Sequence, residues 1–281
     1  MLNKIIVFIH TIIPHHLLSR FVGKLAHSKM PLIKNTFIKR FVKAYSVDLS
    51  AAIITEPTDY ECFNDFFTRQ LKPGQRPVDQ APGSIISPVD GAISQLGDIE
   101  NGQLIQAKGI DYEVAQLLGG DKTHAAQYHG GKFMTLYLAP KDYHRVHMPV
   151  TGTLEEMVYV PGRIFSVNKT STLHVPNLFV RNERVVCRFK TEHGMMTLVL
   201  VGAMIVASIK TVWEGVVAPY TSRTVKKWQY PDRKIHLEKG EEMGCFQLGS
   251  TVIILMEKNV NWDNALDVDM DVMMGQKIGQ I

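Results

Sequence analysis

The C-terminal two-thirds of the chain has the pattern of a β protein. Short runs rich in β-branched and aromatic residues alternate with Gly, Pro and Asp, which predicts strands joined by tight turns. The expected strands are 132–138, 154–160, 184–189, 197–201, 203–209 and 251–256. Helical periodicity is scarce there, and its best short example is 112–118. We therefore expect a β-rich catalytic domain over 80–281, folded as a barrel or a sandwich.

The N-terminal 46 residues have a helical pattern instead, so the fold class is α+β. In the segment 33–45 the apolar residues lie on one half of a helical wheel and Lys39, Arg40 and Lys43 lie on the other. The segment 17–25 repeats this amphipathic arrangement. Residues 1–46 are therefore expected to form amphipathic, membrane-binding helices, and residues 47–79 a connecting segment with a short helix at 60–69.

Charge separates the same two parts of the chain. The protein has 281 residues, 31 Lys and Arg, 27 Asp and Glu, and a net charge of +4. Residues 1–47 contain eight basic residues and no acidic one, which leaves 23 basic and 27 acidic residues for 48–281. A basic arm on a mildly acidic body argues against nucleic-acid binding. The lack of acidic residues favours an arm that meets anionic lipid over a helical hairpin packed on its own core, although the pattern alone allows both.

Neither a spanning helix nor a disulfide framework is expected. The longest apolar run, 5–13, contains His10 and stops at Pro14, well short of the ~20 residues that a bilayer requires. No small-residue cleavage site follows it, so a signal peptide is not expected. The three cysteines, Cys62, Cys187 and Cys245, are too few and too widely spaced for a disulfide framework or a CxxC metal site.

Three polar clusters could carry chemistry. The first, Ser87-Pro88-Val89-Asp90-Gly91, contains an acid but is also typical of a turn. In the second, His144 and His147 could be a general acid and base or a pair of structural histidines, and a zinc site is disfavoured because no third ligand has a suitable spacing. In the third, Gly249 precedes Ser250, whose hydroxyl can attack the preceding carbonyl; a plain turn is the alternative. Together they supply the Asp, His and Ser of an activated serine, while the absence of GxSxG disfavours an α/β-hydrolase.

An ordered set of motifs extends over nearly the whole chain. It comprises Phe63-Asn64-Asp65-Phe66-Phe67 with Arg69, Pro88-Val89-Asp90-Gly91, Asp142 to Pro149, Val160-Pro161-Gly162, Phe165-Ser166-Val167-Asn168, Asn177-Leu178-Phe179, Arg181-Asn182-Glu183-Arg184, Val201-Gly202-Ala203 and Leu248-Gly249-Ser250-Thr251. This set resembles the pyruvoyl-dependent phosphatidylserine decarboxylase proenzymes. The Leu-Gly-Ser-Thr form of the last motif and the basic arm are similar to the bacterial membrane-associated branch.

The resemblance implies a self-processing carboxy-lyase that converts phosphatidylserine to phosphatidylethanolamine. Asp90 would orient His147, and His147 would deprotonate Ser250, which attacks the carbonyl of Gly249. Scission would give a β chain, 1–249, and an α chain, 250–281, that stay associated. The α chain would carry a covalent pyruvoyl group made from Ser250, which forms a Schiff base with the substrate amine. His144 is the candidate proton donor in decarboxylation, and no metal is expected.

The resemblance also implies a peripheral enzyme on the cytoplasmic side of the cell membrane, and it allows a homodimer. Two other classes of protein have to be weighed against it. A serine hydrolase would use Ser250, His147 and Asp90 on an external ester and keep its chain intact. A catalytically inert membrane-surface adaptor would explain the arm but would leave the three clusters as coincidental turns.

Overall fold

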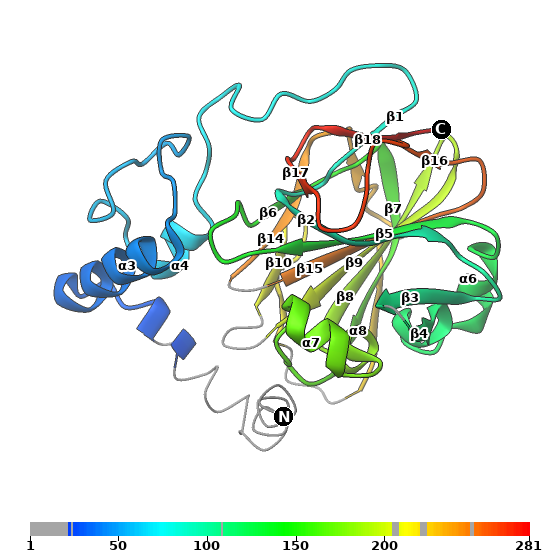
Figure 1. Cartoon of the computed structure of the whole chain (residues 1–281), viewed down its shortest axis with the longest axis horizontal. Helices are drawn as coiled ribbons and strands as arrows, with labels where there is room; N and C mark the ends of the chain where they lie inside the picture. The colour runs from blue at the N-terminus through cyan, green and yellow to red at the C-terminus, as the bar shows by residue number, and fades with distance from the viewer. Residues whose placement is uncertain (1–21, 24, 108, 204–207, 220–223, 248–249) are drawn as a thin grey trace.

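A computed structural model describes residues 22–281 except 24, 108, 204–207, 220–223 and 248–249. A strand-rich body carries a small helical unit on one side, and a long irregular segment connects the two (Figure 1). The helices are α3 (Pro31–Tyr45), α4 (Phe63–Phe67), α5 (Val114–Leu117), α6 (Lys122–Gln127), α7 (Lys169–His174) and α8 (Leu178–Arg181).

The largest sheet runs in the order β12-β7-β8-β9-β15-β5-β2-β17, with β13 also paired to β7. Its strands are β2 (Gly91–Asp98), β5 (Lys132–Leu138), β7 (Gly152–Val160), β8 (Arg184–Thr191), β9 (Gly194–Gly202), β12 (Lys226–Gln229), β13 (His236–Leu237), β15 (Ser250–Met256) and β17 (Asp271–Val272). Neighbouring strands are antiparallel throughout. We call it the central sheet.

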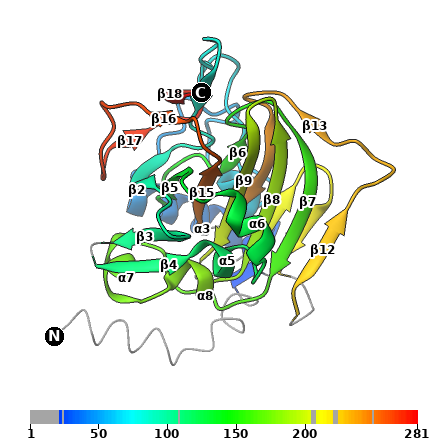
Figure 2. The same ribbon diagram turned by 90° about the vertical axis from the view of Figure 1, so that its right-hand side faces the viewer.

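Three smaller sheets accompany the central sheet. The second sheet has the order β11-β10-β14-β6, and the others are β1-β18-β16 and β3-β4. Their strands are β1 (Ser84–Ile86), β3 (Gln103–Ala107), β4 (Ile110–Glu113), β6 (Arg145–His147), β10 (Ile209–Thr211), β11 (Gly215–Ala218), β14 (Glu242–Phe246), β16 (Asn261–Trp262) and β18 (Lys277–Gln280). In Figure 2 the β3–β4 hairpin lies with α5, α7 and α8 at the base of the body.

The central sheet is buried on both faces, which explains its continuous apolar runs. One face, with Leu136, Leu200 and Val252, shares an apolar cluster with residues of the second sheet such as Val146 and Phe246. The other face packs against the β3–β4 hairpin and the short helices. All seven residues of β15 are buried between β5 and β9.

The expected β-rich fold is confirmed, but a closed barrel is wrong. In the described part of the chain the edge strands β12 and β17 do not pair with each other, and closure would require that pairing. The expected strands over 132–138, 154–160, 184–189, 197–201 and 251–256 correspond to β5, β7, β8, β9 and β15. The expected strand 203–209 falls mostly outside the described residues, and the expected helix 112–118 is shorter, as α5, because its first residues form β4.

The helical unit has its own apolar cluster, built from residues between Ala26 and Phe67. Helix α3 packs its Phe37 ring on the Phe63 ring of α4, with 4.1 Å between the centroids. Lys39, Arg40 and Lys43 remain exposed on the opposite side. Part of the apolar side of α3 is therefore covered by the chain itself, although Leu32 and Tyr45 remain exposed. Most of the other amphipathic segment, 17–25, lies outside the described residues. In the described part of the chain, no helix combines the length and apolarity needed to cross a bilayer.

Candidate active site

Ser250 begins β15 in the middle of the central sheet. It lies opposite Leu138 of β5 on one side and Gly202 of β9 on the other. Its side chain is fully buried, and its Oγ has no hydrogen-bond partner among the residues that the structure describes. Buried polar atoms usually have a partner, so this hydroxyl is a candidate for a functional group.

The chain passes from the second sheet into the central sheet just before Ser250. Strand β14 ends at Phe246, and β15 starts four residues later. The Phe246 amide donates a hydrogen bond to the His144 carbonyl at 3.0 Å. The end of β14 therefore lies next to His144, which directly precedes β6.

His144 is a buried, neutral base. Its ring packs on Phe67, with 4.0 Å between the ring centroids, and its Nδ1 lies 2.9 Å from the Asp142 carbonyl. A carbonyl only accepts, so Nδ1 carries the proton and Nε2 keeps a lone pair. That Nε2 is buried without a partner in the described part of the chain. Burial lowers the pKa of His144 to about 3, so the ring is uncharged at neutral pH.

His147 ends β6 with both ring nitrogens engaged. Nδ1 donates to the Gly240 carbonyl at 2.8 Å, and Nε2 lies 3.1 Å from the Tyr143 hydroxyl. Because Nδ1 holds the ring proton, the Tyr143 hydroxyl must be the donor to Nε2. Burial lowers the pKa of His147.

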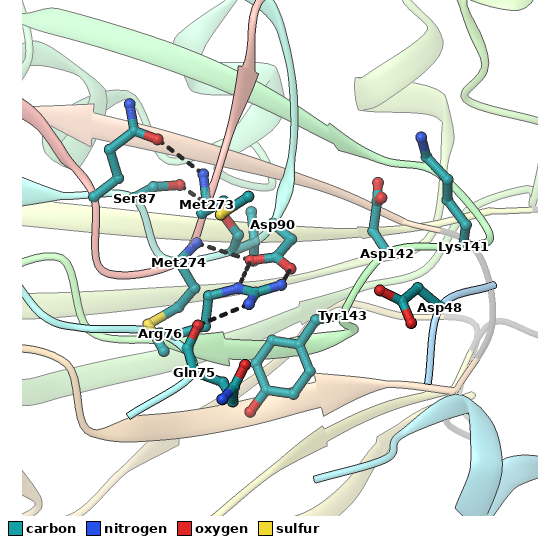
Figure 3. A network of polar contacts seen from close by, with 12 residues as sticks. Asp48, Gln75, Arg76, Ser87, Asp90, Lys141, Asp142, Tyr143, Met273 and Met274 are labelled. Atoms are coloured by element: carbon teal, nitrogen blue, oxygen red, sulfur yellow. Dashed lines mark hydrogen bonds and ion pairs between the residues drawn. The ribbon is translucent and has the colours of Figure 1, made fainter. Parts of the chain in front are cut away.

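Asp90 forms an ion pair with Arg76 (Figure 3). Its Oδ1 accepts from Arg76 Nε at 2.8 Å and from the Met274 amide at 2.9 Å, and its Oδ2 accepts from Arg76 Nη2. Among the described residues no hydrogen bond joins Asp90 to His147. The two loops still meet, because the His147 amide donates to the Pro88 carbonyl at 2.9 Å, and the negative charge of Asp90 partly offsets the lowering of the His147 pKa.

The structure thus brings the Asp90 turn beside His147 and places His144 beside Phe246, close in sequence to Ser250. Among the described residues no hydrogen bond joins Asp90, His147 and Ser250 into a triad, and Asp90 faces Arg76 instead. In Figure 3 the ring of Tyr143 lies beside the Arg76–Asp90 pair.

Sequence reasoning gave no role to three residues of this site. Arg76 comes from an irregular segment without a motif, so nothing in the sequence indicated that it would pair with Asp90. Tyr143 and Arg69 belong to recognisable motifs, but only the fold shows their contacts. The Arg69 guanidinium is buried and donates to the carbonyls of Lys141 and Asp142 at 2.7 and 3.1 Å, which secures the loop before His144.

Two basic residues near the site differ in their availability for an anionic ligand. Arg145 donates from Nη1 to both carboxylate oxygens of Glu242, at 3.0 and 2.8 Å, and is neutralised there. Lys141 is exposed. Of these two, only Lys141 has an ammonium group free for a lipid phosphate.

A cluster of side chains of the kinds that bind metals lies away from Ser250, at the start of α6 and on β7. Ligand atoms of Asp121, His124 and Glu156 lie within 4.8 Å of one another. The ammonium of Lys227 already lies 3.0 Å from Asp121 and 3.7 Å from Glu156. A cationic side chain therefore occupies the place that a metal ion would need.

Comparison with known proteins assigns the chain to one group of enzymes. A family model described as phosphatidylserine decarboxylase matches residues 63–280, and another described as PSD matches 5–46. The phosphatidylserine decarboxylase proenzyme of Stutzerimonas stutzeri strain A1501 is 57% identical over 284 residues, covering 100% of this chain and 95% of the relative. The proenzyme of Pseudomonas fluorescens strain Pf0-1 is 54% identical, covering 100% and 99%. That of Azotobacter vinelandii strain DJ is 54% identical, covering 96% and 95%.

Proposed function

Because the chain belongs to the phosphatidylserine decarboxylase family, we propose that it decarboxylates phosphatidylserine with a pyruvoyl group that it makes from its own Ser250. The observation that carries this proposal is the buried hydroxyl of Ser250, which has no partner in the described part of the chain. Most structural hydroxyls of buried strands are hydrogen-bonded, and of the two hydroxyls that begin β15 without a partner among the described residues, only Ser250 directly follows Gly249 in the Leu-Gly-Ser-Thr motif. A hydroxyl that is consumed during maturation does not need a permanent hydrogen-bond partner. The position therefore fits a serine that is converted into a pyruvoyl group.

Self-cleavage begins with the Ser250 hydroxyl. His147 takes its proton while Oγ bonds to the carbonyl carbon of Gly249, and the bond from that carbon to the Ser250 nitrogen breaks as the nitrogen gains a proton. Elimination across Ser250 then removes its Cα proton and releases chain 1–249 with a C-terminal carboxylate, which leaves a dehydroalanine at residue 250. Addition of water to that group and loss of ammonia leave the α-keto cap on chain 250–281. His147 can act as the base only after Nε2 has left the Tyr143 hydroxyl, and the negative charge of Asp90 stabilises the protonated ring that results.

In turnover the pyruvoyl group supplies the electron sink for the carbanion that forms when carbon dioxide leaves. His144 moves the protons. Its neutral Nε2 cannot protonate carbon in the state that the structure describes, so it must first take up a proton during turnover. That proton can then pass to the substrate carbon. Burial against Phe67 keeps Nε2 away from bulk water between these steps.

Other contacts near the site keep the two chains associated after scission. Strand β15 stays between β5 and β9, and the Met274 amide stays bonded to Asp90, so chain 250–281 remains bound to chain 1–249. The basic arm brings the body to an anionic membrane surface, where the acyl chains of the substrate lie. We place the enzyme peripherally on the cytoplasmic side of the cell membrane.

The test is the intact mass of freshly expressed protein, wild type beside Ser250→Ala. We expect two fragments from the wild type, the smaller without an N-terminal amine, and a single 31.6 kDa chain, less one oxygen atom, from the variant. Thr251→Val is the matched control, because Thr251 is the adjacent buried hydroxyl without a partner among the described residues, and it should still be cut. An intact wild-type chain that becomes acylated by an external ester would establish a serine hydrolase instead.

A further inference from the structure

A second buried acid, Glu183, lies near Ser250 and has no role in the cleavage steps assigned to His147 and Asp90. Glu183 is 2% exposed and immediately precedes β8. Its Oε1 accepts a hydrogen bond from the Tyr159 hydroxyl at 2.5 Å, while its Oε2 is buried without a partner among the described residues. An unsatisfied oxygen on a buried carboxyl is costly unless the group is protonated or serves a function.

Backbone pairing places Glu183 across a single strand from Ser250. Ser250 lies opposite Gly202 on β9, and the Gly202 amide donates to the Glu183 carbonyl at 2.9 Å. Two strand spacings correspond to about 10 Å between the Cα atoms. Glu183 and Ser250 therefore lie at the same end of the central sheet.

Their side chains also point to the same face. Alternate residues of a strand share a face, so Ser250 points the same way as Val252, and Glu183 the same way as Val185. Val252, Val185 and Tyr159 all belong to the apolar cluster between the central sheet and the second sheet. Gly202 has no side chain, so nothing on β9 stands between the carboxyl and the hydroxyl at that level.

The surroundings favour the protonated form of this carboxyl. Burial raises the pKa of Glu183 to about 7, and the hydrogen bond from Tyr159 offsets part of the rise. The guanidinium of the adjacent Arg184 points away, to the carbonyls of Gln116 and Leu117. Two nearby guanidinium groups, those of Arg163 and of Arg181 at the end of α8, lie over the ring of Phe165. The strands on the other side, β9 and β15, present Gly202 and Ser250, which carry no charge.

We propose that Glu183 is the acid of the self-cleavage reaction, donating a proton to the Ser250 nitrogen as the bond from that nitrogen to the Gly249 carbonyl carbon breaks. This inference rests on the proposed function. The proton that His147 takes from the Ser250 hydroxyl balances the one that Glu183 gives to the nitrogen, and its return from His147 to Glu183, directly or through solvent, restores both groups. An amine leaves a tetrahedral centre only when it is protonated, so the step needs such a donor.

The experiment follows the cleavage of newly synthesised full-length chain, by intact mass against time, in buffers from about pH 5 to about pH 9. Cleavage of the wild type should slow as the pH rises through the pKa of Glu183, because the acid loses its proton. Glu183→Gln should be cut about 10²-fold more slowly and should lack that decline. Glu156→Gln, which changes another buried glutamate, serves as the control and should keep the wild-type rate and profile.

Tyr159→Phe distinguishes a proton donor from a merely structural acid. Since the Tyr159 hydrogen bond lowers the pKa of Glu183, its loss should raise that pKa and move the decline in cleavage rate to higher pH. A wild-type profile in both Glu183→Gln and Tyr159→Phe would overturn the proposal, and if Glu183→Gln fails to fold, the position of the decline in Tyr159→Phe decides. A wild-type chain that is never cut would instead refute the proposed function itself.

Discussion

The Tyr143 hydroxyl lies 3.1 Å from Nε2 of His147 and occupies the lone pair that the proposed base must use. His147 cannot accept the proton of Ser250 until this hydrogen bond opens. A hydrogen bond of this kind contributes about 0.5–1.5 kcal/mol net. In the proposed mechanism, the uncut chain must therefore break this hydrogen bond before it can react.

Tyr143→Phe should accelerate self-cleavage, by up to about tenfold, because it frees Nε2 while Gly240 still fixes the ring through Nδ1. The measurement is the rate at which full-length chain disappears after synthesis. Tyr137→Phe, which removes a phenol hydroxyl from the neighbouring strand β5, is the control and should leave the rate unchanged. Slower cleavage in Tyr143→Phe would show that the hydroxyl passes the proton on rather than blocking it.

Replacement of His147 and replacement of His144 should impair different reactions, self-cleavage and decarboxylation respectively. His147→Ala removes the proposed base and should remain an uncut chain. His144→Ala should be cut, because its Nε2 is assigned to turnover, but should lose most of its decarboxylation rate, by about 10²-fold or more. Intact mass reports the first property and carbon dioxide release the second. Equal failure of both variants to process would contradict this division of roles.

Acid should destabilise the uncut protein through His144. Its pKa is about 3 in the folded chain against an ordinary value of 6.5, so between these values the unfolded chain binds more protons. The contribution of His144 to the free energy of unfolding is thus complete above about pH 6.5 and decreases as the pH falls toward 3, by at most about 1.4 kcal/mol per pH unit.

Denaturant unfolding of Ser250→Ala, with and without His144→Asn, measures this dependence. The double variant should lose less stability between neutral and acidic pH than its Ser250→Ala parent. His193→Asn in the same parent, a change at an exposed histidine, is the control and should follow the parent. Parallel curves for all three proteins would show that His144 is not protonated on unfolding.

The sequence pattern predicted the central strands, but it did not predict whether the sheet closes into a barrel or stays open. The run that became β15 is apolar on nearly every residue, which indicates burial on both faces but does not identify the neighbours. A barrel and an open pair of packed sheets demand the same pattern from such a strand. Only the pairing of the edge strands distinguishes them, and that depends on contacts between residues distant in the sequence.

The candidate site shows the same limit. Asp90, His144, His147 and Ser250 were recognisable because their residue types and motifs carry chemistry. Their partners were not recognisable, since Arg76 meets Asp90 through the folding of irregular segments, and the Tyr143 contact depends on the local turn into β6. A motif therefore indicates which groups react, whereas the hydrogen bonds that hold them ready come from tertiary structure.

The basic side of α3 provides the sharpest test of membrane binding. Because the apolar side of α3 packs against α4, deleting the arm would also expose the rings of α4 and confuse lost binding with lost folding. Lys39, Arg40 and Lys43 are exposed and can be replaced by Gln without disturbing that packing. Each basic residue near an anionic surface contributes about 1 kcal/mol.

The triple Gln variant should consequently bind phosphatidylserine-containing vesicles about 10²-fold more weakly than the wild type, in a sedimentation assay at low salt. Wild-type binding should itself weaken as salt is added, because screening shortens the reach of these charges. Replacement of three exposed lysines outside the arm, Lys122, Lys190 and Lys258, removes the same net charge and should change binding far less. Equal losses in the two triple variants would mean that net charge, and not the orientation of α3, draws the protein to the surface. Unchanged binding in the α3 variant would leave α3 as an internal packing element and place the membrane contact elsewhere on the chain.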